Sequence, residues 1–365
     1  MRLKMPQPGA KDRFVAIEMG ATETQDAALL VHGAYAPLTT FMNQSQYQSV
    51  LHSMRLPEGA LFPMPIVLPV ASEIAQRLIP GQVVALRGSN GWTGELRVTQ
   101  TFERDLQREA QLVYGTTSCQ HPGVATLLQS PAWCAAGSVT LCREGESMFP
   151  EAQWPHQVRA AITEMGWETV TFFQTRNPPH RAHEYMLKLA LEATDGLVIH
   201  PLVGPTKRDD VPATIRMAAY RTLIREYFPG DRVLLATFGG AMRYAGPREA
   251  LFHGLVRKNY GATHVIVGRD AAGVGTFYSP MRATQLFRSL AGDIGVTPLC
   301  FDQIGYCCKC QSLASDRTCP HRSDWLAMSG TMVRDLLRHR ESPPIEVMRP
   351  EIATILMTYY RSQEG

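Results

Sequence analysis

The stretch 173–184, which reads FQTRNPPHRAHE, constrains the fold more than any other part of this sequence. An apolar segment, 169–173, precedes it, and a helical pattern follows over 181–193. Pro178 and Pro179 restrict the turn that joins the two. A strand that runs through such a turn into a helix directs the first N–H groups of the helix, and its positive end, to one point outside the sheet. We therefore expect an anion to bind there, and phosphate is the usual one.

His180 and His183 lie three residues apart, which places both imidazoles on one face at the start of the expected helix. Together with Arg176 they could contact phosphate oxygens. A zinc site is not indicated, because HRAHE matches neither HExxH nor HxxEH and the segment offers no third ligand. The structural alternative is a capped helix with surface polar residues, which explains the prolines and the preceding strand less well.

From residue 154 onward, apolar strands alternate with amphipathic helices, which is the pattern of βα units in a parallel sheet. Strands are expected to begin near residues 169, 196, 233, 264 and 296. Helices are expected over 154–165, 181–193, 211–227, 247–259 and 281–290. In such sheets ligands bind outside the carboxyl ends of the strands, near the point where the strand order reverses.

Three further polar motifs follow these strands, with Lys207 and Arg208 in the first, Arg243 and Arg248 in the second, and Gly268, Arg269 and Asp270 in the third. The first pair is either solvated or steers anions. The second pair could meet phosphate, although a salt bridge is the better interpretation for one of the two. The third motif opens a glycine-rich loop that is neither a P-loop nor a proper GxGxxG, so it indicates a ligand site only in combination with the other motifs.

The N-terminal region contains short β-like segments separated by turn signals, at 61–70, 82–88 and 94–103, with a helix over 43–54. Its polar residues show no catalytic spacing, which favours a supporting domain of mostly β character. Near the end, Ser329 can cap a helix, and 345–361 is typical of a closing helix or helix pair. We predict three parts, bounded as 1–153, 154–303 and 304–365.

Four ligand-type residues gather in the last part, Cys307, Cys310, Cys319 and His321. Three thiolates and one imidazole suffice for a closed tetrahedral zinc site of structural type, with Cys308 as the spare thiol. Reduced cysteines in a loop are the alternative. We expect buried free thiols at the remaining positions, Cys119, Cys134, Cys142 and Cys300.

A net charge of +3 over 365 residues is too small to favour nonspecific nucleic-acid binding. The N-terminus has no apolar core of a signal peptide, and the longest apolar stretch, 61–71, is broken by three prolines, which excludes a membrane span. We expect a cytoplasmic globular protein without nucleic-acid or membrane partners.

Five segments, YAPLTTFM, QTRNPPHRAHE, MRYAGPREA, GRDAAGVGTFY and RPEIATILMTYY, give the chain a resemblance to the ATP sulfurylase (sulfate adenylyltransferase) family. The resemblance covers nearly the whole sequence. It implies an α/β protein with a β-rich, PUA-like N-terminal domain, a Rossmann-like nucleotidyltransferase domain with a parallel sheet, and a small C-terminal subdomain. The sequence has no Walker loop, so we expect no adenylylsulfate kinase domain of the kind that some members carry.

The resemblance also assigns roles to matching positions. It implies that sulfate binds Gln174, Arg176 and the backbone of Ala272. The catalytic residues that the resemblance implies are Thr175, Arg176, Asn177, His180 and His183, and the two histidines are expected to hold the triphosphate. The ATP-binding residues that it implies are Gln174, Asn177, His180, His183, Gly268, Arg269, Asp270, Ala271 and Ile304, of which Ile304 is expected to contact adenine. Ala271 departs from the family, where many members have histidine, so its own contact is open.

The implied reaction is reversible in-line attack of sulfate on the α-phosphorus of ATP, which gives adenylyl sulfate and pyrophosphate. Sulfate is already ionised, so the reaction requires positioning and charge stabilisation rather than a general base. Mg²⁺ is expected with the phosphates, and the family is commonly homo-oligomeric.

Two alternatives stay open at this point. One is adenylyl transfer to another acceptor, such as a phosphorylated small molecule, although Gln174 beside Arg176 favours a small tetrahedral dianion. The other is a non-catalytic RNA-binding protein, which the near-neutral charge disfavours. The physiological direction of the reaction is also open.

Overall fold

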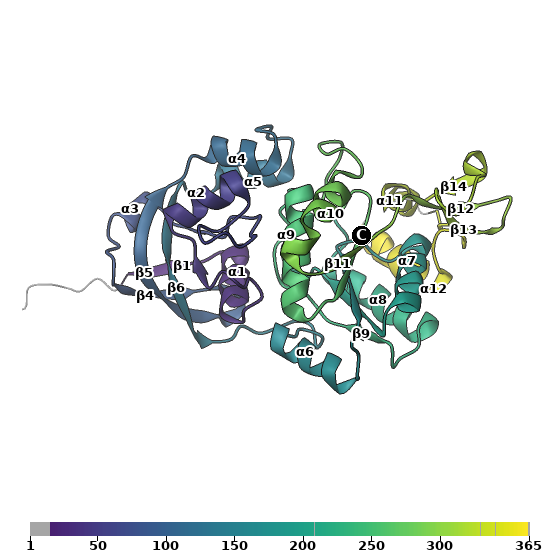
Figure 1. The fold of residues 1–365 in the computed structure, drawn as a ribbon, viewed down its shortest axis with the longest axis horizontal. Helices are drawn as coiled ribbons and strands as arrows, with labels where there is room; N and C mark the ends of the chain where they lie inside the picture. The colour runs from purple at the N-terminus through teal and green to yellow at the C-terminus, as the bar shows by residue number, and fades with distance from the viewer. Residues whose placement is uncertain (1–14, 208, 329, 340, 364–365) are drawn as a thin grey trace, which may run out of the picture.

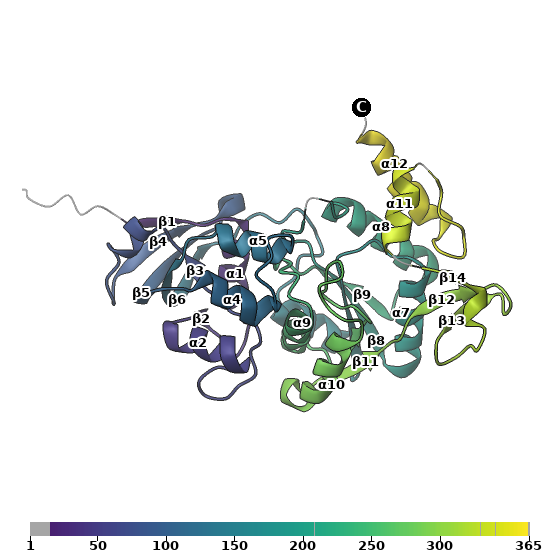
Figure 2. The same cartoon turned by 90° about the horizontal axis from the view of Figure 1, so that it is seen from above.

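The computed structural model describes residues 15–207, 209–328, 330–339 and 341–363. Figure 1 shows the N-terminal elements at one end of an elongated molecule, a central α/β part, and the C-terminal elements at the other end. The view from above keeps this order (Figure 2). The predictions made for Arg208, for Ser329 and for the first fourteen residues lie outside the described residues.

The N-terminal part is a six-stranded sheet with short helices packed on it (Figure 1). Its strands are β1 (Ala16–Glu18), β2 (Thr40–Phe41), β3 (Leu68–Pro69), β4 (Val83–Arg87), β5 (Thr93–Glu103) and β6 (Trp133–Arg143). Its helices are α1 (Ala21–Val31), α2 (Gln44–Ser53), α3 (Ser72–Ala75), α4 (Leu106–Tyr114) and α5 (Pro122–Gln129). The strand order is β1-β4-β5-β6-β2, with β3 also paired to β6.

Most of the predicted N-terminal elements are present. The helix α2 begins after Asn43, whose side chain accepts the N–H of Gln46 at 2.9 Å, and β4 and β5 occupy the two later β-like segments. The segment 61–70 forms only the two-residue strand β3, because prolines lack the N–H that a sheet requires. The long strand β6 was not predicted, since its first half, WCAAG, shows no alternation of polar and apolar residues.

The central part is a five-stranded parallel sheet. Its strands are β7 (Val170–Thr175), β8 (Gly196–Pro201), β9 (Val233–Leu235), β10 (His264–Val267) and β11 (Thr297–Cys300). Its helices are α6 (Pro155–Glu164), α7 (Arg181–Ala193), α8 (Ala213–Tyr227), α9 (Pro247–Tyr260) and α10 (Arg282–Ile294). The order β11-β10-β7-β8-β9 confirms the predicted series and places the reversal between β7 and β10, which carry two of the polar motifs at their ends.

The two faces of this sheet belong to different hydrophobic cores. Phe172 of β7 belongs to a core that includes residues of α6, α9, α10 and the N-terminal part, whereas Phe173 belongs to a core that includes residues of α7, α8 and the C-terminal helices. Neighbouring residues of a strand point to opposite faces, so a run of apolar residues serves both cores. Because the first core continues without a break into the N-terminal sheet, these two parts pack as one body.

Helix α9 and the loop before it fasten the N-terminal part. The guanidinium of Arg243 donates to both carboxylate oxygens of Asp26, at 2.9 and 2.7 Å. Arg248 donates to four backbone carbonyls of the N-terminal part, at 2.6 to 3.0 Å, those of Val50, Leu51, Pro63 and Leu112. Arg243 is therefore the arginine of this pair that forms a salt bridge, and both hold the two parts together.

The C-terminal part consists of a small antiparallel sheet and two helices. Its strands, in the order β13-β12-β14, are β12 (Ile304–Cys307), β13 (Ser312–Ser315) and β14 (Trp325–Ala327). Its helices are α11 (Gly330–Arg338) and α12 (Pro350–Ser362), the second of which is the predicted closing helix. The C=O of Val347 accepts the N–H of Arg181, and Arg349 binds Glu184 through two hydrogen bonds, so this part is fixed to the start of α7.

The scattered cysteines agree only in part with the prediction of buried thiols. Cys134 is buried and Cys300 is half-buried, but Cys119 and Cys142 are exposed. The prediction is wrong for these two, because Cys119 lies in the loop before α5 and Cys142 near the outer end of β6. Among the described residues, no helix has both the length and the apolar character that crossing a membrane requires.

Candidate active site

A cleft of about 240 Å³ lies at the carboxyl ends of β7 and β10, where the strand order reverses. Five of the residues predicted to bind ATP or sulfate line it, Arg176, Asn177, Arg269, Asp270 and Ala271. The opposite wall includes Gly330 and Arg334 of α11. The fold thus brings together residues from three distant segments at the place where parallel sheets bind ligands.

The charged side chains of the cleft are predominantly basic. Its lining includes Arg176, Lys207, Arg269 and Arg334 together with two carboxylates, Asp210 and Asp270. An excess of cationic donors in a partly enclosed space favours a ligand with several negative charges. This composition fits a triphosphate and an oxyanion better than it fits a neutral ligand.

The turn after β7 is held by its own hydrogen bonds. Thr175 is 5% exposed, and its hydroxyl donates to the C=O of Asn177 at 3.2 Å and accepts the N–H of the same residue at 3.1 Å. The hydroxyl of Tyr220 on α8 donates to the Thr175 hydroxyl and to the Asn177 C=O, both at 3.2 Å. The Thr175 hydroxyl therefore shapes the turn, and the neighbouring side chains face the cleft.

Arg176 is positioned by three groups around its guanidinium. Nη2 donates to the C=O of Gly273 at 3.0 Å, Nε lies 3.8 Å from the Asp210 carboxylate, and the guanidinium lies 5.0 Å from the centre of the Tyr244 ring. The buried Nε has no hydrogen-bond partner among the described residues. Buried donors are normally satisfied, so this N–H is available to a ligand oxygen.

Gln174 and Ala272 lie beside the cleft and line a smaller adjoining cavity, which shares Ala271 with the cleft. Gln174 is still within β7, which ends two residues later than predicted. Ala272 has a φ of +56°, a left-handed conformation that is costly for a residue with a side chain. Its carbonyl accepts the N–H of Gly246 at 3.1 Å, so neighbouring loops hold this conformation in place.

His180 and His183 stack against each other at the start of α7, with ring centres 3.8 Å apart. The backbone N–H of His180 donates to Nδ1 of His183 at 3.4 Å, and the N–H of Arg181 is taken by Val347. The predicted open helix end is therefore partly closed. Burial lowers the pKa of His180 to about 4, and burial together with His180 lowers the pKa of His183 well below its usual range. Both imidazoles are neutral at pH 7, and Nδ1 of His180 has no partner among the described residues.

Two predicted residues take other positions. Gly268 does not line the cleft, and a Cβ at its position would meet no protein atom within 4 Å, so no protein neighbour requires a glycine there. Ile304 is 6% exposed in the core between α7 and the C-terminal helices, and it does not line the cleft. Its neighbour Gln303 accepts a hydrogen bond from Arg269 at 2.8 Å, which places the start of β12 next to the cleft wall.

Sequence reasoning missed Asp210 and Arg334 as cleft residues and left Lys207 undecided. Lys207 and Asp210 follow β8 in one loop, where the side-chain nitrogen of Lys207 lies 3.7 Å from Asp210. The position of Lys207 in the loop after a strand was the sequence feature that pointed to the cleft, and Asp210 lies in the same loop. Arg334 enters from another part of the fold, and its place on an amphipathic helix gave no local signal.

Cys307, Cys310, Cys319 and His321 form a separate cluster, in which the ligand atoms all lie within 4.8 Å of one another. The Cys310 and Cys319 sulfurs are 3.8 Å apart, and the Cys310 sulfur is 3.2 Å from Nδ1 of His321. These separations agree with tetrahedral coordination, in which sulfur lies about 2.3 Å from zinc. Cys308 is exposed and is not part of the cluster, as predicted.

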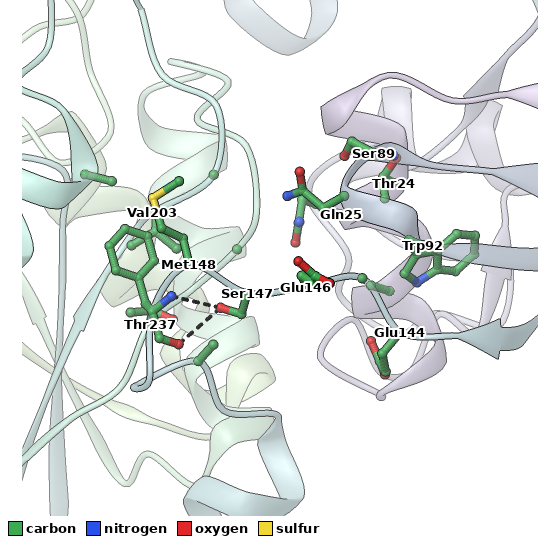
Figure 3. Close-up of a pocket in the computed structure, with 18 of the residues that line it drawn as sticks. Thr24, Gln25, Ser89, Trp92, Glu144, Glu146, Ser147, Met148, Val203 and Thr237 are labelled. Carbon is green, nitrogen blue, oxygen red and sulfur yellow. Dashed lines mark hydrogen bonds between the residues drawn. The ribbon is translucent and has the colours of Figure 1, made fainter.

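Another cavity, of about 520 Å³, lies between the N-terminal and central parts (Figure 3). Thr24, Gln25 and Trp92 line it from one part, and Val203 and Thr237 line it from the other. None of the predicted site residues belongs to it. Volume alone therefore does not identify the site, and the convergence of charged residues at the strand ends does.

Comparison with known proteins decides the family. Residues 151–359 match the ATP-sulfurylase family, and residues 7–144 match a PUA-like domain. The chain belongs to the ATP-sulfurylase family. Its fold class is therefore the predicted one, with a PUA-like N-terminal domain, a parallel-sheet catalytic domain and a small C-terminal antiparallel sheet.

Similar members of the family include two proteins named sulfate adenylyltransferase. The chain is 47% identical to one from Symbiobacterium thermophilum, over 94% of this chain and 89% of that protein. It is 45% identical to one from Chloroflexus aurantiacus, over 99% of this chain and 95% of that protein. Among solved structures, a chain described as a hexameric APS kinase from Thiobacillus denitrificans shares the fold, with a TM-score of 0.74 at 22% identity. The alignment covers 95% of this chain and 63% of that one.

Proposed function

We propose that this chain carries out its adenylyl transfer from ATP to sulfate, which gives adenylyl sulfate and pyrophosphate, by in-line attack of sulfate on the α-phosphorus. Its family membership and the names of its relatives support this activity. The observation that carries the proposal is the basic cleft at the reversal between β7 and β10, built around the turn that contains Arg176 and Asn177. A cleft of this charge suits two mutually repelling anions.

The reaction requires no proton transfer. A sulfate oxygen attacks the α-phosphorus, a new P–O bond forms, and the bond between the α-phosphorus and the bridging oxygen breaks, so that pyrophosphate leaves with the electron pair. Both nucleophile and leaving group are anions already, and the chain contributes alignment and positive charge. The arginines and the start of α7 supply that charge.

We assign sulfate to Gln174, Arg176 and the backbone of Ala272. The free Nε–H of Arg176 supports its place in this set, and the left-handed backbone of Ala272 supports a fixed direction for its N–H. Thr175 acts with Arg176 and Asn177 as the catalytic turn, in which its hydroxyl maintains the shape.

We assign the triphosphate to His180 and His183, because an unpartnered buried nitrogen at a helix start is a suitable donor to phosphate. Gln174, Asn177 and the loop 268–271 bind the rest of ATP, and Ile304, whose side chain is buried in the core, contacts adenine through its backbone at the start of β12. The contact between Gln303 and Arg269 supports that placement. Magnesium enters with ATP as a substrate complex, and Asp270 is a carboxylate of the cleft that suits its preference for oxygen ligands.

We also propose that Cys307, Cys310, Cys319 and His321 bind structural zinc. With four protein ligands the metal has no open position, so its contribution is to the stability of the C-terminal sheet. Three domains bounded as 1–153, 154–303 and 304–365, a homo-oligomeric state and a cytoplasmic location complete the proposal. Light scattering tests the oligomeric state. Initial rates of adenylyl sulfate formation and of ATP formation show which direction of the reaction is faster.

The decisive assay is sulfate-dependent exchange of labelled pyrophosphate into ATP. Wild-type chain is expected to exchange label only when sulfate is present, whereas exchange that depends on a phosphorylated acceptor would support a different adenylyltransferase. Arg176→Ala should lower the exchange rate by orders of magnitude with an unchanged circular dichroism spectrum. A folded and equally active variant would contradict the role given to Arg176.

A further inference from the structure

A small cavity separates the predicted sulfate residues from helix α9. Gln174 and Ala272 line it on the side of the cleft, and His253 and Arg257 line it on the side of the helix. Its volume of about 30 Å³ is close to that of one or two water molecules. Sulfate does not fit inside, so a group behind the cavity would not touch sulfate and could influence it only through its charge.

Arg257 is that group. It is 1% exposed, and none of its three guanidinium nitrogens has a hydrogen-bond partner among the described residues. Its guanidinium carbon lies 4.4 Å from the centre of the Phe238 ring. Burial lowers the pKa of Arg257 to about 9, so it still carries its charge at neutral pH. A buried cation without a hydrogen-bonded partner is rare, because desolvation is strongly unfavourable.

Among the residues that the structure describes, no carboxylate forms a salt bridge with Arg257. Glu249, two turns earlier on α9, uses its oxygens to accept the backbone N–H groups of Arg243 and Ala245, at 2.7 and 2.9 Å. His253 lies between the two, 3.6 Å from Glu249, and burial lowers its pKa far enough to keep it neutral. His200 of β8 is likewise neutral for the same reason. Glu249 thus acts on the Arg257 guanidinium only without a direct hydrogen bond, and the two neighbouring imidazoles carry no charge.

We propose that Arg257 is a positioning residue that selects doubly charged over singly charged tetrahedral anions at the sulfate site. Its charge acts through the small cavity and the protein interior, where weak screening lets a cation influence a ligand that it does not contact. Binding of a dianion supplies the missing negative charge. This inference rests on the proposed function, because it takes the residues beside the cavity to be the sulfate site.

The test compares Arg257→Met with wild type, using sulfate as the dianion and perchlorate as a singly charged anion of the same shape. The KM for sulfate should rise about tenfold and the inhibition constant of perchlorate about threefold, because electrostatic free energy scales with ligand charge. The kcat should change little. Equal losses for the two anions, or none, would overturn the proposal.

Two further variants separate charge from packing. Arg257→Lys keeps the cation and should retain the ratio of the two anion constants, and Arg225→Met removes an exposed arginine of α8 and should leave both constants unchanged. Without sulfate, Arg257→Met should unfold at the same or higher urea concentration, since it removes an uncompensated buried charge. Failure of that variant to fold would show a structural role and overturn the proposal. Absence of exchange in the wild type would instead refute the proposed function.

Discussion

Removing one buried hydroxyl, by Tyr220→Phe, tests how the catalytic turn is held. The Tyr220 hydroxyl shares its proton between the Thr175 hydroxyl and the Asn177 C=O, each at 3.2 Å. Both acceptors keep a second interaction, since these two groups also bond to each other. The substitution thus leaves no acceptor unsatisfied, and we expect a loss of about 1 kcal/mol in the free energy of unfolding. We expect kcat for pyrophosphate exchange to fall about tenfold, because the turn would be less well fixed, with little change in the KM for ATP.

Urea unfolding and initial exchange rates measure the two effects. Tyr227→Phe is a matched control, because Tyr227 also lies on α8 but bonds to Glu351 at the surface. It should leave kcat unchanged. Thr175→Ser should retain activity and Thr175→Val should lose it, as the hydroxyl is needed for the turn. A fully active Tyr220→Phe together with an inactive Thr175→Val would refute this reasoning, since the Thr175 hydroxyl would then act on the substrate itself and not on the turn.

Three other predictions concern stability. The depressed pKa values of His180 and His183 mean that the folded chain binds fewer protons than the unfolded chain, whose histidines titrate near pH 6.5. The stability that the two neutral histidines allow is complete above about pH 6.5 and is lost as the pH falls toward 4. His180→Gln should therefore make the urea midpoint of unfolding less dependent on pH. Arg248→Met should lower the free energy of unfolding by about 3 kcal/mol, because four carbonyls lose their donor, and a loss below about 0.5 kcal/mol would contradict this. Cys310→Ser should reduce the zinc content measured by atomic absorption and lower the unfolding temperature, and an unchanged metal content would exclude the site.

The parallel sheet could be predicted because each of its strands is a short apolar run between helical patterns. The N-terminal part was harder. The first half of strand β6, 134–137, is buried on both faces and therefore shows no alternation, so its sequence gives a weak signal. The contacts of the arginines at 243 and 248 could not be predicted either. Arg248 binds backbone carbonyls at least 136 positions away, and a backbone acceptor does not depend on the residue type.

The position of cleft residues could be predicted where they follow a strand end, as for Arg176 and Arg269, since topology alone brings those ends together. It was incomplete for Arg334, which reaches the cleft through the packing of the C-terminal helices. The closed start of α7 was also unexpected, because its partner Val347 is more than 160 positions away. Residues that complete a site from another part of the fold require the structure.

We propose that the basic cleft at β7 and β10 joins sulfate to the adenylyl group of ATP. Its most direct test is the exchange of labelled pyrophosphate into ATP by purified chain with Mg²⁺, with and without sulfate. Exchange that requires sulfate in the wild type, and falls by orders of magnitude in folded Arg176→Ala, is the predicted result. Exchange without sulfate, or a variant as active as the wild type, would contradict the account.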